Sequence, residues 1–470
     1  MKRSIINILV LFIIIEAIVL SMTGCANIIP PSGGPKDTIP PRLAIAIPKD
    51  SAVNVKNNRI TLTFDEFVDV KEVQQNLIVS PNPKNSPVVN SKLKNVTIKL
   101  RDTLEPNTTY SLNFGNSIKD VNEGNILKGF TYVFSTGNYI DSNTLSGKVI
   151  LAETGRFDSS LIVVLHNNLA DSVIVKNRPR YYTKVNSKGL FTFKHLPFGR
   201  FNVFVIPNDY SKRYDDSTKM FAFSDTPVVV GKSTPVISLY AYEEAKKKPA
   251  NKPASSNNNN KSKPLKEDKK LHFSFNLDGK LKDILNDTLL LTCNKKLKQI
   301  DTSKIILTDT NYHRIKGYTF YMDSSQTKIA ILNHWKEGAP YKLLMAKDAV
   351  TDSLGTILTK ADTINFTSKK ESEYGSLKLR FGYYDVTKHP VLQFIQNDKI
   401  VESVPIKQKE FYRKLFYPGD YELRILFDAN GNGIWDPGNY KQKRQPEVVF
   451  KIDNKISVRG NWDNEVDVHF

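Results

Sequence analysis

Short runs of alternating apolar and polar residues recur throughout the chain. Residues 58–67 read NRITLTFDEF and residues 96–102 read VTIKLRD, so every second side chain is apolar over most of each run. This period of two is typical of a strand that buries one face. The runs are separated by turns rich in Gly, Pro, Asn and Asp, and beyond the N-terminus no stretch has the pattern of a long, capped amphipathic helix. The pattern therefore predicts an all-β fold of tandem sandwiches.

The strand pattern occurs twice. Residues 103–136 align with residues 334–368, and Tyr110 then falls on Tyr341. Agreement in order, spacing and turn residues indicates a duplication. The two predicted copies are domain A1, residues 41–137, and domain A2, residues 271–368.

A second repeat follows each copy. Residues 196–216 align with residues 416–437, and Gly199 falls on Gly419. The predicted order is therefore A–B–linker–A–B, as the duplication of one pair would produce. The two further copies are domain B1, residues 143–242, and domain B2, residues 375–470.

The linker between the pairs, residues 243–270, is rich in Lys, Asn, Pro and Ser and has almost no apolar residue, so it cannot build a core. As a flexible coil it would span about 30 Å. Its nine lysines could contact anionic lipid or glycan, although a solvated spacer is the simpler interpretation. Part of the net charge of +19 lies here, so that charge does not indicate a basic face, and no nucleic acid partner is expected.

The N-terminus has the layout of an export signal. A basic start precedes a long apolar run, and small residues then lead to Cys25. This predicts a secretory signal peptide over residues 1–24. The tetrapeptide MTGC that ends at Cys25 is similar to a bacterial lipobox, which implies that Cys25 carries the lipid anchor. An uncleaved membrane anchor is the alternative, and the proline-rich residues 25–40 are expected to form an extended tether.

One candidate metal site lies near the C-terminus, in the stretch LFDANGNGIWDPGNY. Counting Asp428 as position 1 gives the first half of an EF-hand-type calcium loop. The expected ligands are Asp428, Asn430, Asn432, the main-chain carbonyl of Ile434, and Asp436. Position 12 is Asn439 and not Glu, so calcium, the cofactor that this pattern suggests, would bind weakly, at roughly 10⁻⁴ to 10⁻³ M. The alternative is a metal-free turn held by Asx side chains, and the matching turn of B1, PNDYSKRYDDS, should hold no metal.

Other chemistry is not indicated. Cys293 lies in a strand-like run, LLLTCNKK, where a buried and inert thiol is expected. The seven histidines lack metal-ligand spacing, and GxSxG, HExxH and GxxxxGK[ST] motifs do not occur. Aromatic clusters at 178–184, 333–335 and 381–385 could stack on sugars, but strand alternation favours packing in the core. We therefore expect no catalytic site.

The repeats resemble known families. Domain A1 contains PPRLAIAIPKDSAVNV, ITLTFDEFV, LEPNTTYSLNF and YVFSTG, a pattern similar to the bacterial Ig-like module of the SbsA or Big_5 type. Domain A2 keeps WKEGAPYKLLMAKDAVTDSLG but lacks the proline-rich opening. The B domains, with LSGKVILAE and KGLFTFKHLPFGRFNVFVIPND in B1, resemble transthyretin-like or carboxypeptidase-regulatory-like β-sandwiches. The whole layout resembles Ig-like-domain lipoproteins of Bacteroidota.

This resemblance implies a non-enzymatic, lipid-anchored protein of the outer membrane, facing either the periplasm or the cell surface. We predict a scaffold or interaction module for an envelope protein partner. One alternative is a calcium-dependent adhesin or glycan-binding protein. Another is an accessory subunit of an outer-membrane assembly or secretion complex. Structural motifs of this kind identify a fold more directly than an activity.

Overall fold

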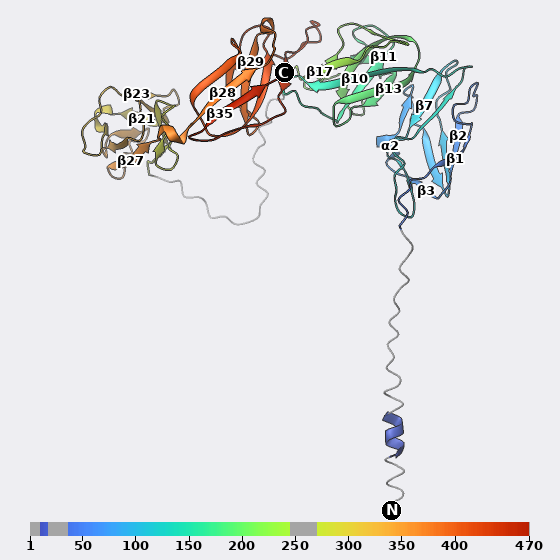
Figure 1. Cartoon of the computed structure of the whole chain (residues 1–470), viewed down its shortest axis with the longest axis horizontal. Coiled ribbons are helices and arrows are strands. Elements are labelled where there is room, and N and C mark those ends of the chain that lie inside the picture. Colours follow the sequence, from blue (N-terminus) through green and yellow to red (C-terminus); the bar gives the residue numbers. More distant parts are fainter. Residues whose placement is uncertain (1–9, 17–35, 245–269, 470) are drawn as a thin grey trace, which may run out of the picture. The chain divides into compact units, whose positions relative to one another are not determined.

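The computed structural model describes residues 10–16, 36–244 and 270–469 (Figure 1). They form two compact units, residues up to 142 with 195–197, and residues 143–194 with those from 198 onward. Cys25, most of the predicted signal peptide and tether, and nearly all of the linker lie outside the described residues.

Domain A1 is a β-sandwich. A four-stranded sheet in the order β1-β2-β6-β5 faces a three-stranded sheet in the order β4-β7-β9, and β3 pairs with β8. The strands are β1 (Leu43–Ile47), β2 (Arg59–Phe64), β3 (Val68–Val70), β4 (Ile78–Ser80), β5 (Val88–Lys92), β6 (Asn95–Lys99), β7 (Thr109–Asn113), β8 (Ile118–Asp120) and β9 (Thr131–Ser135).

The core of A1 follows the alternation in the sequence. On β2, Ile60, Leu62 and Phe64 are fully buried, while the threonines between them are partly exposed. These side chains join one cluster with Leu112 of β7 and Tyr132 of β9, which come from the other sheet. Burial of this apolar face therefore holds the two sheets together.

Domain A2 repeats this plan. The sheet β18-β20-β24-β23 corresponds to β1-β2-β6-β5, the run β22-β25-β27 to β4-β7-β9, and the pair β21-β26 to β3-β8, with β19 added beside β27. The strands are β18 (Phe273–Phe275), β19 (Leu281–Lys282), β20 (Thr288–Cys293), β21 (Leu297–Ile300), β22 (Ile305–Thr308), β23 (Thr319–Met322), β24 (Lys328–Leu332), β25 (Pro340–Met345), β26 (Val350–Asp352) and β27 (Asp362–Ser368).

Domains B1 and B2 share a second plan. The sheets β13-β10-β17 and β12-β11-β14-β15 of B1 correspond to β31-β28-β35 and β30-β29-β32-β33 of B2, and β16 and β34 pair with β14 and β32. The strands of B1 are β10 (Asn143–Leu151), β11 (Leu161–His166), β12 (Tyr181–Lys184), β13 (Leu190–Leu196), β14 (Gly199–Pro207), β15 (Ala222–Phe223), β16 (Val228–Val230) and β17 (Ile237–Ala241). The strands of B2 are β28 (Gly375–Phe381), β29 (Pro390–Gln396), β30 (Lys399–Pro405), β31 (Glu410–Phe416), β32 (Gly419–Phe427), β33 (Val448–Lys451), β34 (Ile456–Val458) and β35 (Asp463–Val468).

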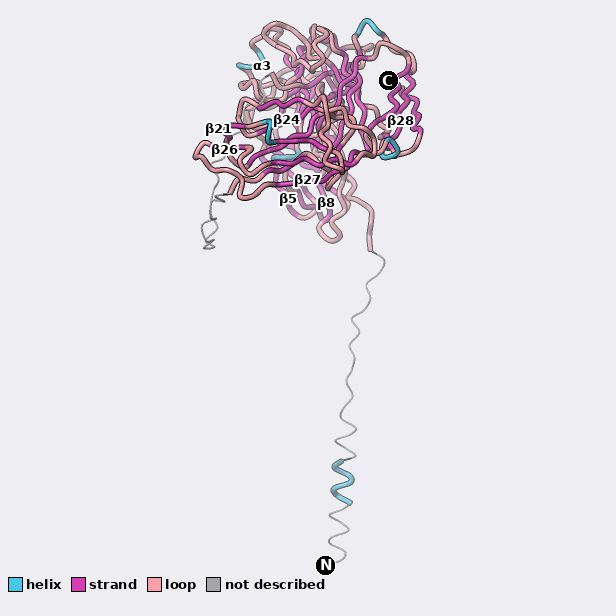
Figure 2. Tube along the Cα trace, turned by 90° about the vertical axis from the view of Figure 1, so that its left-hand side faces the viewer, coloured by secondary structure: helices cyan, strands magenta, loops and turns pink. Residues whose placement is uncertain are grey.

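Helical segments are short, and those after residues 10–16 stand between strands (Figure 2). They are residues 10–16, α2 (Val73–Asn76), α3 (Val173–Lys176) and the 3₁₀ turns η1 (Thr302–Lys304), η2 (Glu371–Glu373) and η3 (Val386–Lys388). In the part of the chain that the structure describes, no helix has both the length and the apolar character needed to cross a membrane.

The predicted fold class is confirmed. The chain is all-β, and its strand orders alternate between two sandwich plans, each of which occurs twice. Each plan occurs twice because its two copies have the same order of alternating apolar residues and turn residues. The domain boundaries drawn from the sequence stay predictions.

A buried carboxylate fixes the same turn in both A domains. Asp120 ends β8 and is 1% exposed, and its Oδ atoms accept main-chain N–H groups of Glu123 at 2.6 Å, Gly124 at 2.9 Å and Asn125 at 2.5 Å. Asp352 of A2 does the same for Leu354 and Thr356. Burial acts to raise the pKa of Asp120, but the main-chain donors outweigh it and hold that pKa below its ordinary value.

We predict that Asp120→Ala raises hydrogen exchange over residues 118–127 of the full chain, measured by mass spectrometry. The variant leaves several amides unpaired, which should cost about 1–3 kcal/mol of local stability. Because the folded pKa is depressed, the stabilisation by Asp120 is present above the unfolded pKa and is lost as the pH falls through the folded pKa. Asp120→Asn should lack this acid-dependent loss, and unchanged exchange in Asp120→Ala would contradict the role of the carboxylate.

Candidate functional site

The connection from β32 to β33 carries the sequence-predicted site residues. It has two parts, which we call the Asp428 loop (residues 428–436) and the tongue (residues 437–447). Both leave the end of β32, the central strand of its sheet in B2. The position is typical of functional segments, because a rigid sheet presents a long connection.

Asp428 organises the first part of the Asp428 loop. Its side chain is 2% exposed, and its carboxylate accepts main-chain N–H groups of Gly431 at 2.8 Å and Gly433 at 2.7 Å. Both glycines have positive φ, +74° and +80°, a conformation that other residues rarely adopt. The carboxylate therefore forms the Asx-type turn that the sequence offered as the alternative to a metal site.

Asp436 organises the second part. Its Oδ2 accepts the side-chain amides of Asn430 at 2.6 Å and Asn432 at 2.7 Å. Ile434 is exposed, and its main-chain N–H donates to Asn432 Oδ1 at 2.8 Å. The structure thus brings the side chains of Asp428, Asn430, Asn432 and Asp436 into one hydrogen-bonded loop.

Glu447, at the end of the tongue, closes the Asp428 loop. Its carboxylate accepts the main-chain N–H groups of Ala429 at 2.8 Å and Asp436 at 3.0 Å, and its side chain is 9% exposed. Burial raises the pKa of Glu447, and the nearby charges of Asp428 and Asp436 raise it further. Three carboxylates therefore lie in one neighbourhood. In the described residues no group of three or more His, Cys, Asp or Glu side chains has the geometry of a metal centre.

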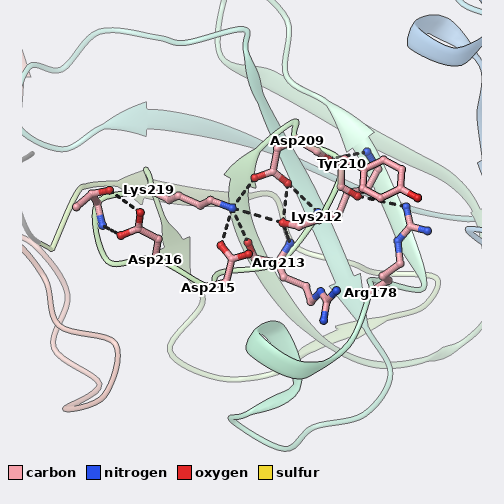
Figure 3. A network of polar contacts seen from close by, with 10 residues as sticks. Arg178, Asp209, Tyr210, Lys212, Arg213, Asp215, Asp216 and Lys219 are labelled. Atoms are coloured by element: carbon pink, nitrogen blue, oxygen red, sulfur yellow. Dashed lines mark hydrogen bonds and ion pairs between the residues drawn. The ribbon is translucent and has the colours of Figure 1, made fainter.

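The corresponding turn of B1 contains a cation of its own. Figure 3 shows Lys219 reaching between Asp209 and Asp215. Its Nζ lies 2.5 Å from Asp209 Oδ2 and 2.6 Å from Asp215 Oδ1, and it also donates to Ser211 Oγ at 3.4 Å and to the carbonyl of Arg213 at 3.5 Å. Burial acts to lower the pKa of Lys219, but the two carboxylates outweigh it and raise that pKa. The ammonium group of Lys219 thus supplies the positive charge that holds these oxygen atoms close together.

The Asp428 loop differs from this turn in its charges. Among the described residues no lysine or arginine forms an ion pair with Asp428, Asp436 or Glu447. Its carboxylates are instead held by main-chain N–H groups and side-chain amides.

The tongue packs onto B1. The ring of Tyr440 contacts the rings of Phe221 and Phe223, each at 5.1 Å between centroids, and that of Phe204 at 5.8 Å. All three phenylalanines belong to the core of B1. Tyr440 is thus an aromatic residue of B2 that completes the core of B1.

Polar contacts surround this aromatic contact. The main-chain N–H of Tyr440 donates to Glu244 at 2.6 Å, and its hydroxyl donates to the carbonyl of Asp171 at 2.8 Å. Lys443 Nζ lies 2.6 Å from the Asp171 carboxylate. Gln445 Nε2 donates to the carbonyl of Phe223 at 3.1 Å. A hydrophobic anchor with a polar rim is typical of a specific protein interface.

Two further residues, Gly438 and Trp435, lie in the contact between B2 and B1. Gly438 approaches Tyr242 of B1 so closely that a Cβ atom would lie 2.6 Å from its ring. Trp435 packs against the cores of both B1 and B2, and its indole N–H donates to the carbonyl of Glu447 at 2.7 Å. The Asp428 loop and the tongue are therefore one hydrogen-bonded body.

Two open grooves flank the tongue. One, of about 850 Å³, is lined by β16, β17 and Pro446, and Phe198 stands at it with an exposed ring. The other, of about 570 Å³, is lined by residues of the Asp428 loop together with Tyr240 and Lys388. Partly apolar concave surfaces of this size are typical of binding sites.

The other residues that the sequence singled out lie outside the β32–β33 connection. Cys25 lies outside the described residues. Cys293 is buried, and burial raises the pKa of its thiol, which disfavours the thiolate. In the aromatic clusters, Tyr181, Trp335 and Phe381 are buried in cores, as strand alternation predicted, whereas Tyr383 is 94% exposed.

Sequence reasoning missed three residues of this site. Lys219 carries no motif, Glu447 lies beyond position 12 of a calcium loop, and Tyr440 packs on strands more than 200 residues earlier. One signal was available, because Trp435 and Tyr440 are large aromatic residues in a turn-rich segment where exposed polar residues are usual.

Tyr440→Ala is predicted to release the tongue from B1. It removes the ring at the centre of the contact and should weaken the pairing of B1 and B2 by about 2 kcal/mol. Hydrogen exchange of the full chain should then rise over 437–447 and around Phe221–Phe223. The matched control is Tyr412→Ala, an exposed tyrosine on β31. Equal exchange in the wild-type and Tyr440→Ala chains would show that the contact contributes no free energy to the pairing of B1 and B2.

Comparisons with known proteins bear on the first domain. Residues 37–136 match the family of bacterial Ig-like domains, Big_5. No curated protein is similar enough in sequence to count as a relative.

Among solved structures, native alpha-2-macroglobulin from Escherichia coli, over its domains MG0-NIE-MG1, is similar at 13% identity, over 39% of this chain and 72% of that chain, with a TM-score of 0.20. The TIE protein of Bacillus anthracis is similar at 10% identity, over 94% and 76%, with a TM-score of 0.17. The N-terminal part of the bacterial S-layer protein SbsC is similar at 13% identity, over 44% of each chain, with a TM-score of 0.16. The family match alone makes domain A1 similar to bacterial Ig-like domains, as its sequence pattern predicted.

Proposed function

We propose that this chain is a non-enzymatic scaffold of the cell envelope, anchored to the outer membrane through a lipid on Cys25. The tongue contact carries this proposal. Tyr440 and its polar rim join B1 and B2, which lie far apart in the sequence, into one body. A scaffold needs a fixed presentation of its surfaces, because an ordered surface loses less entropy when a partner binds.

The partner in this proposal is another envelope protein. The two grooves beside the tongue are formed by B1 and B2 together, so their shape depends on the pairing. The bacterial Ig-like match of residues 37–136 supports an envelope role for the first domain. Whether the partner is a barrel of an assembly or secretion complex is one outcome of the experiment below.

Crosslinking in intact cells, followed by purification from native membranes, tests the scaffold. We expect the wild-type chain to recover a small, reproducible set of envelope proteins, and Tyr440→Ala to recover less than half as much of them, because it loosens the paired surface. Tyr412→Ala is the control. Recovery that is unaffected by Tyr440→Ala, or that contains no envelope protein, would contradict the proposal.

The anchor and its face are tested on the same cells. If a lipid on Cys25 anchors the chain, Cys25→Ser should remove the chain from the membrane fraction. If an uncleaved N-terminal segment anchors it, the variant should stay in the membrane fraction. Protease added to intact cells should cleave within residues 243–270 if the chain faces the surface. Protection of that segment would indicate the periplasmic face.

A second candidate function is weak calcium binding by the Asp428 loop. The turn of B1 supports it, because Lys219 there supplies a positive charge among Asp209, Asp215 and main-chain oxygen. The Asp428 loop gathers three carboxylates without such a cation among the described residues. Calcium would supply that charge, with Asp428, Asp436 and Glu447 as its acidic ligands and Asn430, Asn432 and the carbonyl of Ile434 as neutral ones.

Calorimetric titration of the full chain with millimolar calcium tests this candidate. We expect a dissociation constant of roughly 10⁻⁴ to 10⁻³ M. Glu447→Gln should abolish the heat, because it removes one of three charges. Asp209→Asn, in the turn that already holds Lys219, is the matched control and should leave the heat unchanged. No heat and no thermal shift with the wild-type chain would refute calcium binding.

A further inference from the structure

The turn between β14 and β15 of B1 presents cations and an aromatic ring on a rigid support. Asp209 and Asp215 are both paired with Lys219, which holds the turn closed from within (Figure 3). Asp209 also accepts the main-chain N–H of Lys212 at 2.8 Å. The carboxylates of the turn are therefore engaged internally, and between them the side chain of Tyr210 is exposed, whereas that of Tyr214 is buried.

Tyr210 is the most prominent of these residues. Its side chain is 91% exposed, and the guanidinium of Arg178 lies over its ring at 5.6 Å from the centroid. Arg178 also approaches the carbonyl of Tyr210 at 3.5 Å. In Figure 3 the two side chains lie beside each other at one end of the network. The aromatic ring and the guanidinium thus form a pre-arranged pair at the surface.

Lys212 adds a second cation beside this pair. Its Nζ lies 4.6 Å from the centre of the Tyr182 ring on β12 and donates to Asn208 at 3.1 Å. Burial lowers the pKa of Lys212, and the charges of Arg178 and Lys184 lower it further, against the opposing effect of Asp209. These cations therefore repel one another, and an anion among them would relieve that repulsion.

The charges of this region do not cancel. Four cationic side chains, Arg178, Lys212, Arg213 and Lys219, stand against three carboxylates, Asp209, Asp215 and Asp216 (Figure 3). Lys219 pairs with two of the carboxylates, and Arg178 is the cation that contacts the ring of Tyr210.

From this arrangement we propose that B1 carries a binding site for an acidic polysaccharide, formed by Arg178, Tyr210 and Lys212. A sugar ring would lie on the open side of Tyr210, and its carboxylate or sulfate group would pair with Arg178 and Lys212. The exposed ring favours a sugar over a bare inorganic anion, since a bare anion would gain nothing from an apolar surface. The site lies in B1 and does not depend on the scaffold or on calcium.

Titration of the full chain with oligogalacturonate tests the site, and a neutral dextran of similar length is the comparison ligand. We expect binding of oligogalacturonate that weakens with salt, because it relies on exposed charges. Tyr210→Ala and Arg178→Gln should each weaken it about tenfold, which corresponds to about 1.4 kcal/mol. Both side chains are exposed, so the variants should fold.

The matched control is Tyr312→Ala in A2. Tyr312 is also exposed, and Lys342 Nζ lies over its ring at 3.8 Å, but it does not belong to the B1 turn. Unchanged affinity in this control supports the proposal. Equal loss in the control, equal binding of dextran, or no binding of oligogalacturonate by the wild-type chain would overturn it. Binding to vesicles with anionic lipid, but not to oligogalacturonate, would overturn it in favour of a membrane contact.

Discussion

The aromatic contact of Tyr440 with Phe221 and Phe223 is the interaction on which the pairing of B1 and B2 depends. Apolar rings at the edge of a sandwich core must be covered, because their exposure to water is unfavourable. In B1 Tyr214 and Tyr242 supply part of that cover, and Tyr440 of B2 supplies another part. The polar contacts at Glu244 and Asp171 then set the position of the tongue without adding much burial.

The two B domains differ in one connection. In B1 it is a short turn whose carboxylates enclose Lys219. In B2 it is longer, its first part is tied by Asp428 and Glu447, and its second part reaches B1 as the tongue. In both connections, carboxylates at the end of a strand need hydrogen-bond donors or a cation to offset the cost of their burial. The extended connection gives B2 its contact with B1.

The fold could be predicted from the sequence because alternation is local. The pattern around Leu62 fixes which side chains are buried, and turn residues mark where strands end. The candidate site could be predicted only in part. The spacing from Asp428 identified a side-chain-organised loop, but Lys219, Glu447 and Tyr440 act through contacts that no fixed spacing encodes. The contacts of Lys219 and Glu447 form within one domain and that of Tyr440 forms between two domains, and periodicity specifies neither kind.

The central claim is that B1 and B2 form one cooperative body. Hydrogen exchange of the wild-type full chain, measured along a urea series, tests it most directly through the buried strands β11 and β29. If the claim is correct, both strands lose protection over the same narrow range of urea concentration, because opening one domain removes the support of the other. Loss of protection in β11 and β29 at clearly different urea concentrations would contradict it.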